Sequence, residues 1–158
     1  YEMWIPGEGT LNPGTGFLRP VSSTTLTNPA TAIRAITVGA YDSLTFSYAD
    51  FSGRGPLTGE SASAVKPDLV APGVNVSTIS VGGSVMQFSG TSFSTPFVTG
   101  SAALLMEWGI VRGNDSYLYG EKVKAYLRRG AKPMPGFEEY PNEAVGYGRL
   151  CLAESIPD

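Results

Sequence analysis

Ser92 lies where the sequence changes from an apolar strand pattern to a long run of small and apolar residues. The stretch VMQFSGTSFSTPFVTGSAALLMEWG, from Val85 to Gly109, predicts a strand, a tight turn at Gly90 and a buried helix. A hydroxyl in the first turn of a helix faces unpaired backbone N–H groups and the positive end of the helix dipole. Such a serine is either a helix cap or the nucleophile of an acyl-transfer reaction.

A serine nucleophile needs a base beside it, and in the Ser-His-Asp arrangement that base is a histidine. The sequence contains no histidine. This polypeptide therefore cannot assemble such a triad by itself. No cofactor and no metal ligand are assigned from the sequence.

The helix that would carry Ser92 has almost no polar face. Its first turn contains Pro96, whose missing N–H costs little there, and the segment from Phe97 to Met106 is apolar or small throughout. A helix that is apolar all round belongs in the middle of a domain. Gly109 is the expected C-terminal stop.

The remaining elements are typical of an α/β domain. Near-continuous apolar runs, of the kind found in buried parallel strands, occur at Ala35–Ala40 and Leu69–Ala71. The segment Leu118–Arg129 predicts an amphipathic surface helix that ends at Gly130, with Leu118, Val123, Tyr126 and Leu127 on its apolar face and Glu121, Lys122, Lys124 and Arg128 elsewhere.

Length and composition are those of one globular domain with a sizeable core. The chain has 158 residues and a net charge of −3, and its lysines and arginines are not clustered, so no nucleic-acid partner is indicated. No segment is long and apolar enough to cross a bilayer, so no membrane partner is indicated either. A single cysteine, Cys151, excludes an internal disulfide and is interpreted as a buried apolar thiol.

Several motifs resemble those of the subtilisin-like serine proteases. SGTSFSTP, from Ser89 to Pro96, is similar to the nucleophile signature GTSxAxP, although Ser94 replaces the usual alanine. KPDLVAPGVNV resembles the family's KPDxxAPGxxI strand, FSGRGP its FSxRGP segment, and ITVGA and VGYGRLCLA two further segments, all in family order. The subset FSGRGP, SFSTPFVTGSAALLMEWG and GEKVKAYLRRGA resembles the clostridial spore-germination subtilases.

The resemblance implies a three-layer α/β sandwich with a mostly parallel sheet, of which this chain is the C-terminal portion. Residues 24–158 would be the C-terminal part of the catalytic domain. Residues 1–23 would be an irregular segment, interpreted as the end of an inserted β-domain. The family also suggests an extracytoplasmic or spore-associated location.

The resemblance further implies a serine endopeptidase in which Ser92 is the nucleophile, with Gly90 and Thr91 in supporting roles at the turn. The substrate would be a protein or peptide. The histidine, the aspartate and the oxyanion asparagine would come from the upstream part of the same protease domain. The isolated chain would then be inactive. Its exposed strand edges would make it aggregate, self-associate, or remain stable only through a partner chain or an alternative packing. The alternative is an inactive subtilase that serves as a regulatory or binding scaffold.

Other polar residues are interpreted as structural. Asp68 lies in the wrong chain order for the family's catalytic acid and is expected to pair with Lys66, a contact of little value if exposed. Arg54 is expected to bind a carboxylate or carbonyl groups. Asn28 is expected to stabilise a turn, and the segment 57–64 is expected to be a solvent-exposed loop.

Overall fold

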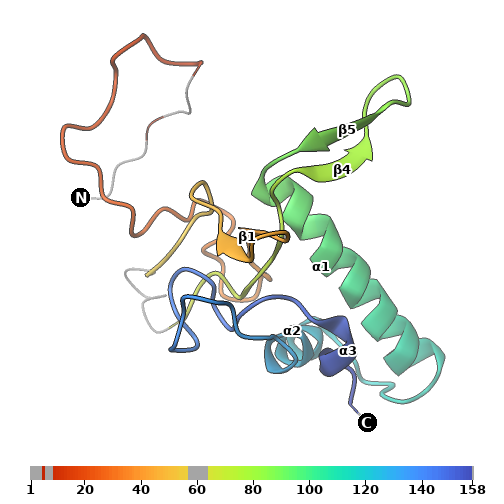
Figure 1. Ribbon diagram of the computed structural model, residues 1–158. Coiled ribbons are helices and arrows are strands. Elements are labelled where there is room, and N and C mark those ends of the chain that lie inside the picture. Colours follow the sequence, from red (N-terminus) through yellow and green to blue (C-terminus); the bar gives the residue numbers. More distant parts are fainter. Residues whose placement is uncertain (1–4, 6–8, 57–63, 158) are drawn as a thin grey trace.

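The computed structural model describes residues 5, 9–56 and 64–157. Figure 1 shows short strands near the middle of the chain and helices in its C-terminal half. The elements are β1 (Val38–Asp42), β2 (Ser47–Tyr48), β3 (Leu69–Pro72), β4 (Val76–Ile79), β5 (Val85–Phe88), α1 (Thr91–Met106), the π-helical turn η2 (Glu107–Val111), α2 (Gly120–Arg129) and α3 (Leu152–Ser155).

The central sheet has the order β2-β1-β3, with β1 parallel to β3 and antiparallel to β2. The predicted parallel strands are therefore confirmed, but β1 begins at Val38 rather than at Ala35. The carbonyl of Ala35 instead accepts hydrogen bonds from Lys66 and Lys124. The carbonyl of Ala35 is therefore bonded to side chains and not to a neighbouring strand.

The two faces of β3 contact different parts of the chain, as the twofold alternation of a strand requires. Leu69 and Ala71 are fully buried against the helices, in a cluster with Val98, Leu105, Leu118, Val123 and Leu127. Val70 points the other way and packs with Met134 and Val145 of an irregular segment. Helices cover one face of the sheet and this loop covers the other, which gives the α/β class that the sequence predicts.

The position of α1 differs from the prediction of a centrally buried helix. Only one side of α1 is buried, through Ser94, Val98, Ser101 and Leu105. The other side is exposed at Phe97, Leu104 and Met106, and we call it the open face of α1. Figure 1 shows the helix along one edge of the molecule. Among the described residues, β1, β3, α2 and α3 pack only on the buried side.

Gly109 does not end the helix, contrary to the sequence prediction. The chain continues through the π-helical turn to Val111, and Gly109 is buried within it. A Cβ at this position would lie 2.7 Å from Cδ2 of Leu118. Close packing against Leu118 therefore explains this glycine, because its backbone does not have the left-handed conformation of a helix stop.

The amphipathic helix is confirmed but begins at Gly120, two residues later than predicted. Leu118 precedes it and is still buried, as are Val123 and Leu127. Lys124 does not lie on the solvent face as expected: its ammonium group donates to the carbonyls of Ile33 and Ala35. These carbonyls come from a distant part of the chain, which the helical periodicity cannot reveal.

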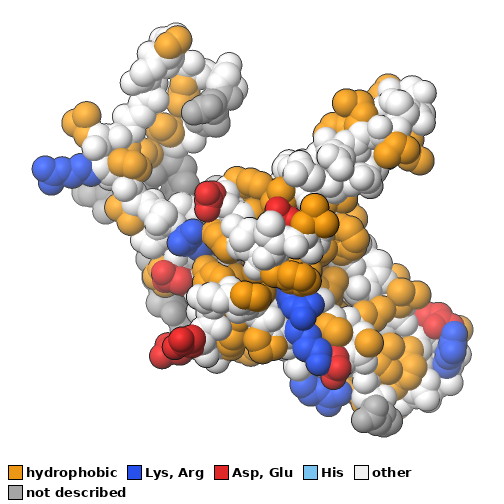
Figure 2. Space-filling model, viewed as in Figure 1, with side chains coloured by type: hydrophobic (Ala, Val, Ile, Leu, Met, Phe, Trp, Pro, Cys, Tyr) orange, Lys and Arg blue, Asp and Glu red, His pale blue; other side chains and the backbone are white. Residues whose placement is uncertain are grey.

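Two segments extend away from the body. The β4–β5 hairpin projects beyond the start of α1, and residues 9–20 form a loop on the other side (Figure 1). No charged residue occurs between Asp68 and Glu107, and in Figure 2 the hairpin shows only apolar and uncharged polar groups. Residues 9–37 contain no helix or strand, and the proposed boundary at residue 23 stays a prediction.

The predicted loop at 57–64 lies outside the described residues except for Ala64. The turn at Asn28 is confirmed, and Thr31 donates a 2.6 Å hydrogen bond to its side-chain oxygen. No helix among the described residues has the length and apolarity needed to cross a membrane.

Candidate active site

Ser92 is the second residue of α1, and its side chain is exposed. The N–H of Phe93 donates to the carbonyl of Gly90 at 3.0 Å. The N–H groups of Thr91 and Ser92 precede this bond and have no partner within the helix. No acidic side chain lies in the first turn, so the positive end of the helix dipole is unneutralised beside the Ser92 hydroxyl.

The turn before Ser92 is fixed against the end of β3. Gly90 has φ 152° and ψ 156°, a conformation that L side chains rarely adopt, and its N–H donates to the carbonyl of Gly73 at 2.8 Å. A Cβ on Gly73 would lie 2.7 Å from Cβ of Ala40 and 3.1 Å from the carbonyl oxygen of Gly90. Only a glycine at position 73 allows this approach.

A buried hydrogen bond from Ser94 joins the first turn of α1 to β3. It is fully buried, and its hydroxyl donates to the carbonyl of Ala71 in β3 at 3.1 Å. In the sequence Ser94 stood out only as a replacement for alanine, and Gly73 had no assigned role. Thr95, Thr99 and Ser101 of α1 also carry hydroxyl groups, so no local signal distinguished Ser94 from them. Together these contacts place Ser92 at the carboxyl end of β3.

An aromatic pair lies next to this turn. The rings of Phe88, at the end of β5, and Phe93 are stacked with centroids 5.3 Å apart and an interplanar angle of 13°. The hydroxyl of Ser89 accepts a 2.9 Å hydrogen bond from the N–H of Asn75. The hairpin and the helix start are thereby joined beside Ser92.

The described residues supply only part of a catalytic arrangement. None of them bonds to the Ser92 hydroxyl, and the whole chain has no histidine. Within the described ranges, no group of three His, Cys, Asp or Glu residues could hold a metal ion. The site contains a hydroxyl, two free backbone donors and a rigid turn.

Residues 14–148 match the model of the subtilase family. The chain belongs to the subtilase family. Its structure is similar to that of the CspB protease of Clostridium perfringens, with a TM-score of 0.86, 45% identity and coverage of 92% of this chain and 30% of CspB. The resemblance to clostridial subtilases is thus confirmed.

Two further comparisons give similar matches to proteases. The serine protease AprX of Bacillus subtilis is 30% identical over an alignment of 155 residues, which covers 85% of this chain and 32% of AprX. The prenylagaramide maturation protease PagA matches with a TM-score of 0.68 and 30% identity, over 85% of this chain and 46% of PagA. The chain spans less than half the length of each.

In this subtilase chain Asp68 lies away from Ser92, at the opposite end of β3. Its ion pair with Lys66 is confirmed at 2.8 Å, but both side chains are fully buried, whereas the sequence interpretation treated the pair as weak if exposed. Burial alone would raise the pKa of Asp68. Hydrogen bonds from Lys66, Thr37 and Arg128 outweigh it and hold the pKa below the ordinary value of 3.8.

The structure differs from two other interpretations of the sequence, those of Arg54 and Cys151. The guanidinium of Arg54 lies 4.7 Å from the centre of the Tyr48 ring, a cation–π contact that the sequence analysis did not include. Cys151 is half-buried rather than buried. Neither residue contributes to the turn that carries Ser92.

Proposed function

We propose that this chain is the nucleophile-bearing part of a subtilisin-like serine endopeptidase. Ser92 Oγ attacks the carbonyl carbon of the scissile peptide bond and forms an acyl-enzyme, and its proton passes through a base to the leaving amine. Water then hydrolyses the ester and releases Ser92. The observation that carries the proposal is the exposed Ser92 in the first turn of α1, with free backbone donors beside it.

In this proposal the backbone N–H of Ser92 donates to the oxyanion of the tetrahedral intermediate. Gly90 allows the substrate backbone to approach, and Thr91 shapes the turn. A second donor must come from elsewhere. Loss of one such side-chain donor costs about 2.7–4 kcal/mol of transition-state stabilisation in subtilisin itself, which belongs to the same family.

The upstream part of the same protease domain is proposed to supply the base, its orienting carboxylate and the second donor. Three observations support this. The chain has no histidine, it covers only 30% of CspB and 32% of AprX, and the open face of α1 exposes Phe97 and Leu104. Burial of that face by the upstream part would complete the layered domain. The substrate is proposed to be a protein or peptide.

The second candidate is a subtilase that has lost catalysis and acts as a binding scaffold. A fold alone does not establish activity. The intact Gly-Thr-Ser sequence at 90–92 favours the enzyme, because a scaffold has no chemical need for an exposed hydroxyl at this turn. The absence of histidine from the chain is compatible with either candidate.

Fluorophosphonate labelling of the full-length protein distinguishes the two. We expect wild type to be labelled and Ser92→Ala to remain unlabelled. Ser116→Ala is the matched control, because Ser116 is an exposed serine outside the site, and it should be labelled like wild type. A folded wild-type protein that fails to react would contradict the enzyme and favour the scaffold.

A further inference from the structure

Asp68 is the centre of a buried cluster of charged side chains between β3 and α2. Its carboxylate lies 2.8 Å from Nζ of Lys66 and 3.1 Å from Nζ of Lys124, and it pairs with the guanidinium of Arg128. The Lys66 and Asp68 side chains are fully buried, and the Lys124 side chain is 8% exposed. Three cations therefore surround one carboxylate.

Within the described residues this cluster has an excess of positive charge. A buried charge without a counter-charge is unfavourable because the protein interior solvates it poorly. The same effect is visible in Lys124: burial lowers its pKa to about 8, and the attraction of Asp68 does not compensate. An additional anion close to Lys124 and Arg128 would stabilise the cluster.

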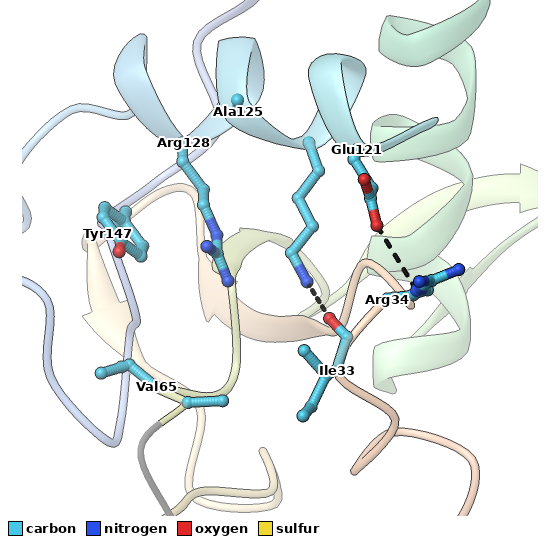
Figure 3. Close-up of a pocket in the computed structure, with 9 residues that line it drawn as sticks. Ile33, Arg34, Val65, Glu121, Ala125, Arg128 and Tyr147 are labelled. Carbon is cyan, nitrogen blue, oxygen red and sulfur yellow. Dashed lines mark hydrogen bonds and ion pairs between the residues drawn. The ribbon is translucent and has the colours of Figure 1, made fainter. Parts of the chain in front are cut away.

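A cavity of about 330 Å³ lies beside the cluster (Figure 3). Its lining includes Ile33, Arg34, Val65, Lys124, Arg128 and Tyr147. Arg128 and Tyr147 lie on one side, and Arg34 and Glu121 lie on the other. The cavity thus has cationic groups on both sides, with a single carboxylate, that of Glu121, at its edge among the described residues.

Arg128 has hydrogen-bonding capacity left for a ligand. Its Nε and Nη2 donate to Asp68, so three of the five N–H donors of a guanidinium are not used in that contact. The group is held 4.7 Å above the Tyr147 ring, and its side chain is 26% exposed. It is therefore both fixed in place and accessible from the cavity.

Arg34 can also turn toward a ligand. Its ion pair with Glu121 is 3.4 Å long, and the two side chains are 89% and 57% exposed. A pair so exposed contributes little to stability. Arg34 can therefore exchange Glu121 for a ligand at small cost.

We propose that this pocket binds an oxyanion, a phosphate or carboxylate group, through Arg128, Lys124 and Arg34. Arg128 provides fork-shaped donors that match either group, and Lys124 provides charge at the cavity wall. The proposal does not depend on the chemistry of Ser92. The oxyanion belongs to a free ligand.

Thermal unfolding of the full-length protein tests the site. Inorganic phosphate and succinate are the two probes, and sodium chloride keeps the ionic strength constant. At a tenfold excess over Kd we expect the Tm to rise by about 3 °C. The rise should disappear in Arg128→Gln and persist in Arg129→Gln, because the neighbouring Arg129 is exposed and lies over the Tyr126 ring.

A second variant leaves the contacts of Asp68 intact. Ala125 is exposed and lines the cavity, so Ala125→Glu introduces a carboxylate next to Lys124 and Arg128. This variant should have a higher Tm than wild type without any probe and should no longer respond to phosphate. It tests the site even if Arg128→Gln fails to fold.

The probes decide the proposal. If wild type responds and Arg128→Gln does not, the site binds a free oxyanion. If wild type does not respond, or if Arg128→Gln responds as wild type does, the proposal is wrong.

Discussion

Replacement of Asp68 by asparagine should strongly destabilise the protein, although the two side chains have nearly the same shape. The carboxylate accepts hydrogen bonds from the N–H of Thr37 at 2.6 Å, Nζ of Lys66 at 2.8 Å and Nε of Arg128 at 2.9 Å. An asparagine side chain at this position would keep one acceptor oxygen and would turn an NH₂ group toward other donors. The substitution would also remove the negative charge that the three cations of the cluster share.

The expected cost follows from burial. Loss of one partner from a buried ion pair typically costs about 3–5 kcal/mol, because the remaining charge is left unpaired in the interior. Lys66 has no exposed side-chain surface and Lys124 has 8%, so neither can reach water without moving the chain around it. We therefore expect a loss in the upper part of this range, equivalent to a fall in Tm of about 10 °C.

The assay is thermal unfolding of the full-length protein at pH 7, followed by circular dichroism. Asp50→Asn is the control, because it makes the same chemical change at an exposed aspartate, and it should change the Tm by less than about 2 °C. If Asp68→Asn is no more destabilising than Asp50→Asn, the carboxylate does not hold the cluster together and the reasoning fails.

Three further predictions concern pH, the turn and the isolated chain. The pKa of Asp68 is lowered in the folded protein. The stabilising contribution of the Asp68 carboxylate is therefore complete above the ordinary pKa of 3.8 and is lost as the pH falls below that value. The difference in Tm between wild type and Asp68→Asn should shrink from pH 5 to pH 2. Gly73→Ala should slow fluorophosphonate labelling of Ser92 at least tenfold, because the added Cβ pushes the start of α1 away from β3. The control Gly120→Ala adds a Cβ in open space and should leave the labelling rate unchanged. Equal labelling rates of the two variants would refute the role of Gly73. The 158-residue chain alone should not be labelled by the fluorophosphonate, and a labelled chain would contradict this expectation. In size-exclusion chromatography with light scattering the chain should elute as oligomers, because the open face of α1 is apolar. A stable monomer would contradict this second expectation.

Local patterns in the sequence predicted much of the fold. The apolar residues of α2 lie where the helical period puts them, and Leu69 and Ala71 share one face of β3 as strand alternation requires. The motif around Ser92 gave the strand, turn and helix in the right order. These features depend on residues close together in the chain, and this is why the sequence was sufficient.

Long-range contacts account for most of what was missed. Lys124 looked like a solvent-facing residue of an amphipathic helix, but it donates to the carbonyl of Ile33, 91 positions earlier. Ser94 looked like a mild substitution, but its hydroxyl bonds to Ala71 across the boundary between helix and sheet. No pattern within α1 or α2 indicates these partners, because they depend on how distant segments pack.

The two ends of β3 are joined to the helices by different kinds of contact. At its amino end, ion pairs join β3 to α2 through Asp68. At its carboxyl end, backbone contacts and a single buried hydroxyl join it to α1 through Gly73 and Ser94, and no charged side chain occurs along the intervening sequence. Every described contact that positions Ser92 thus comes from within this chain. In the proposed mechanism the upstream part of the domain supplies a base and a second oxyanion donor to a turn that is already formed. A substitution there should then alter the proton transfer without moving Ser92.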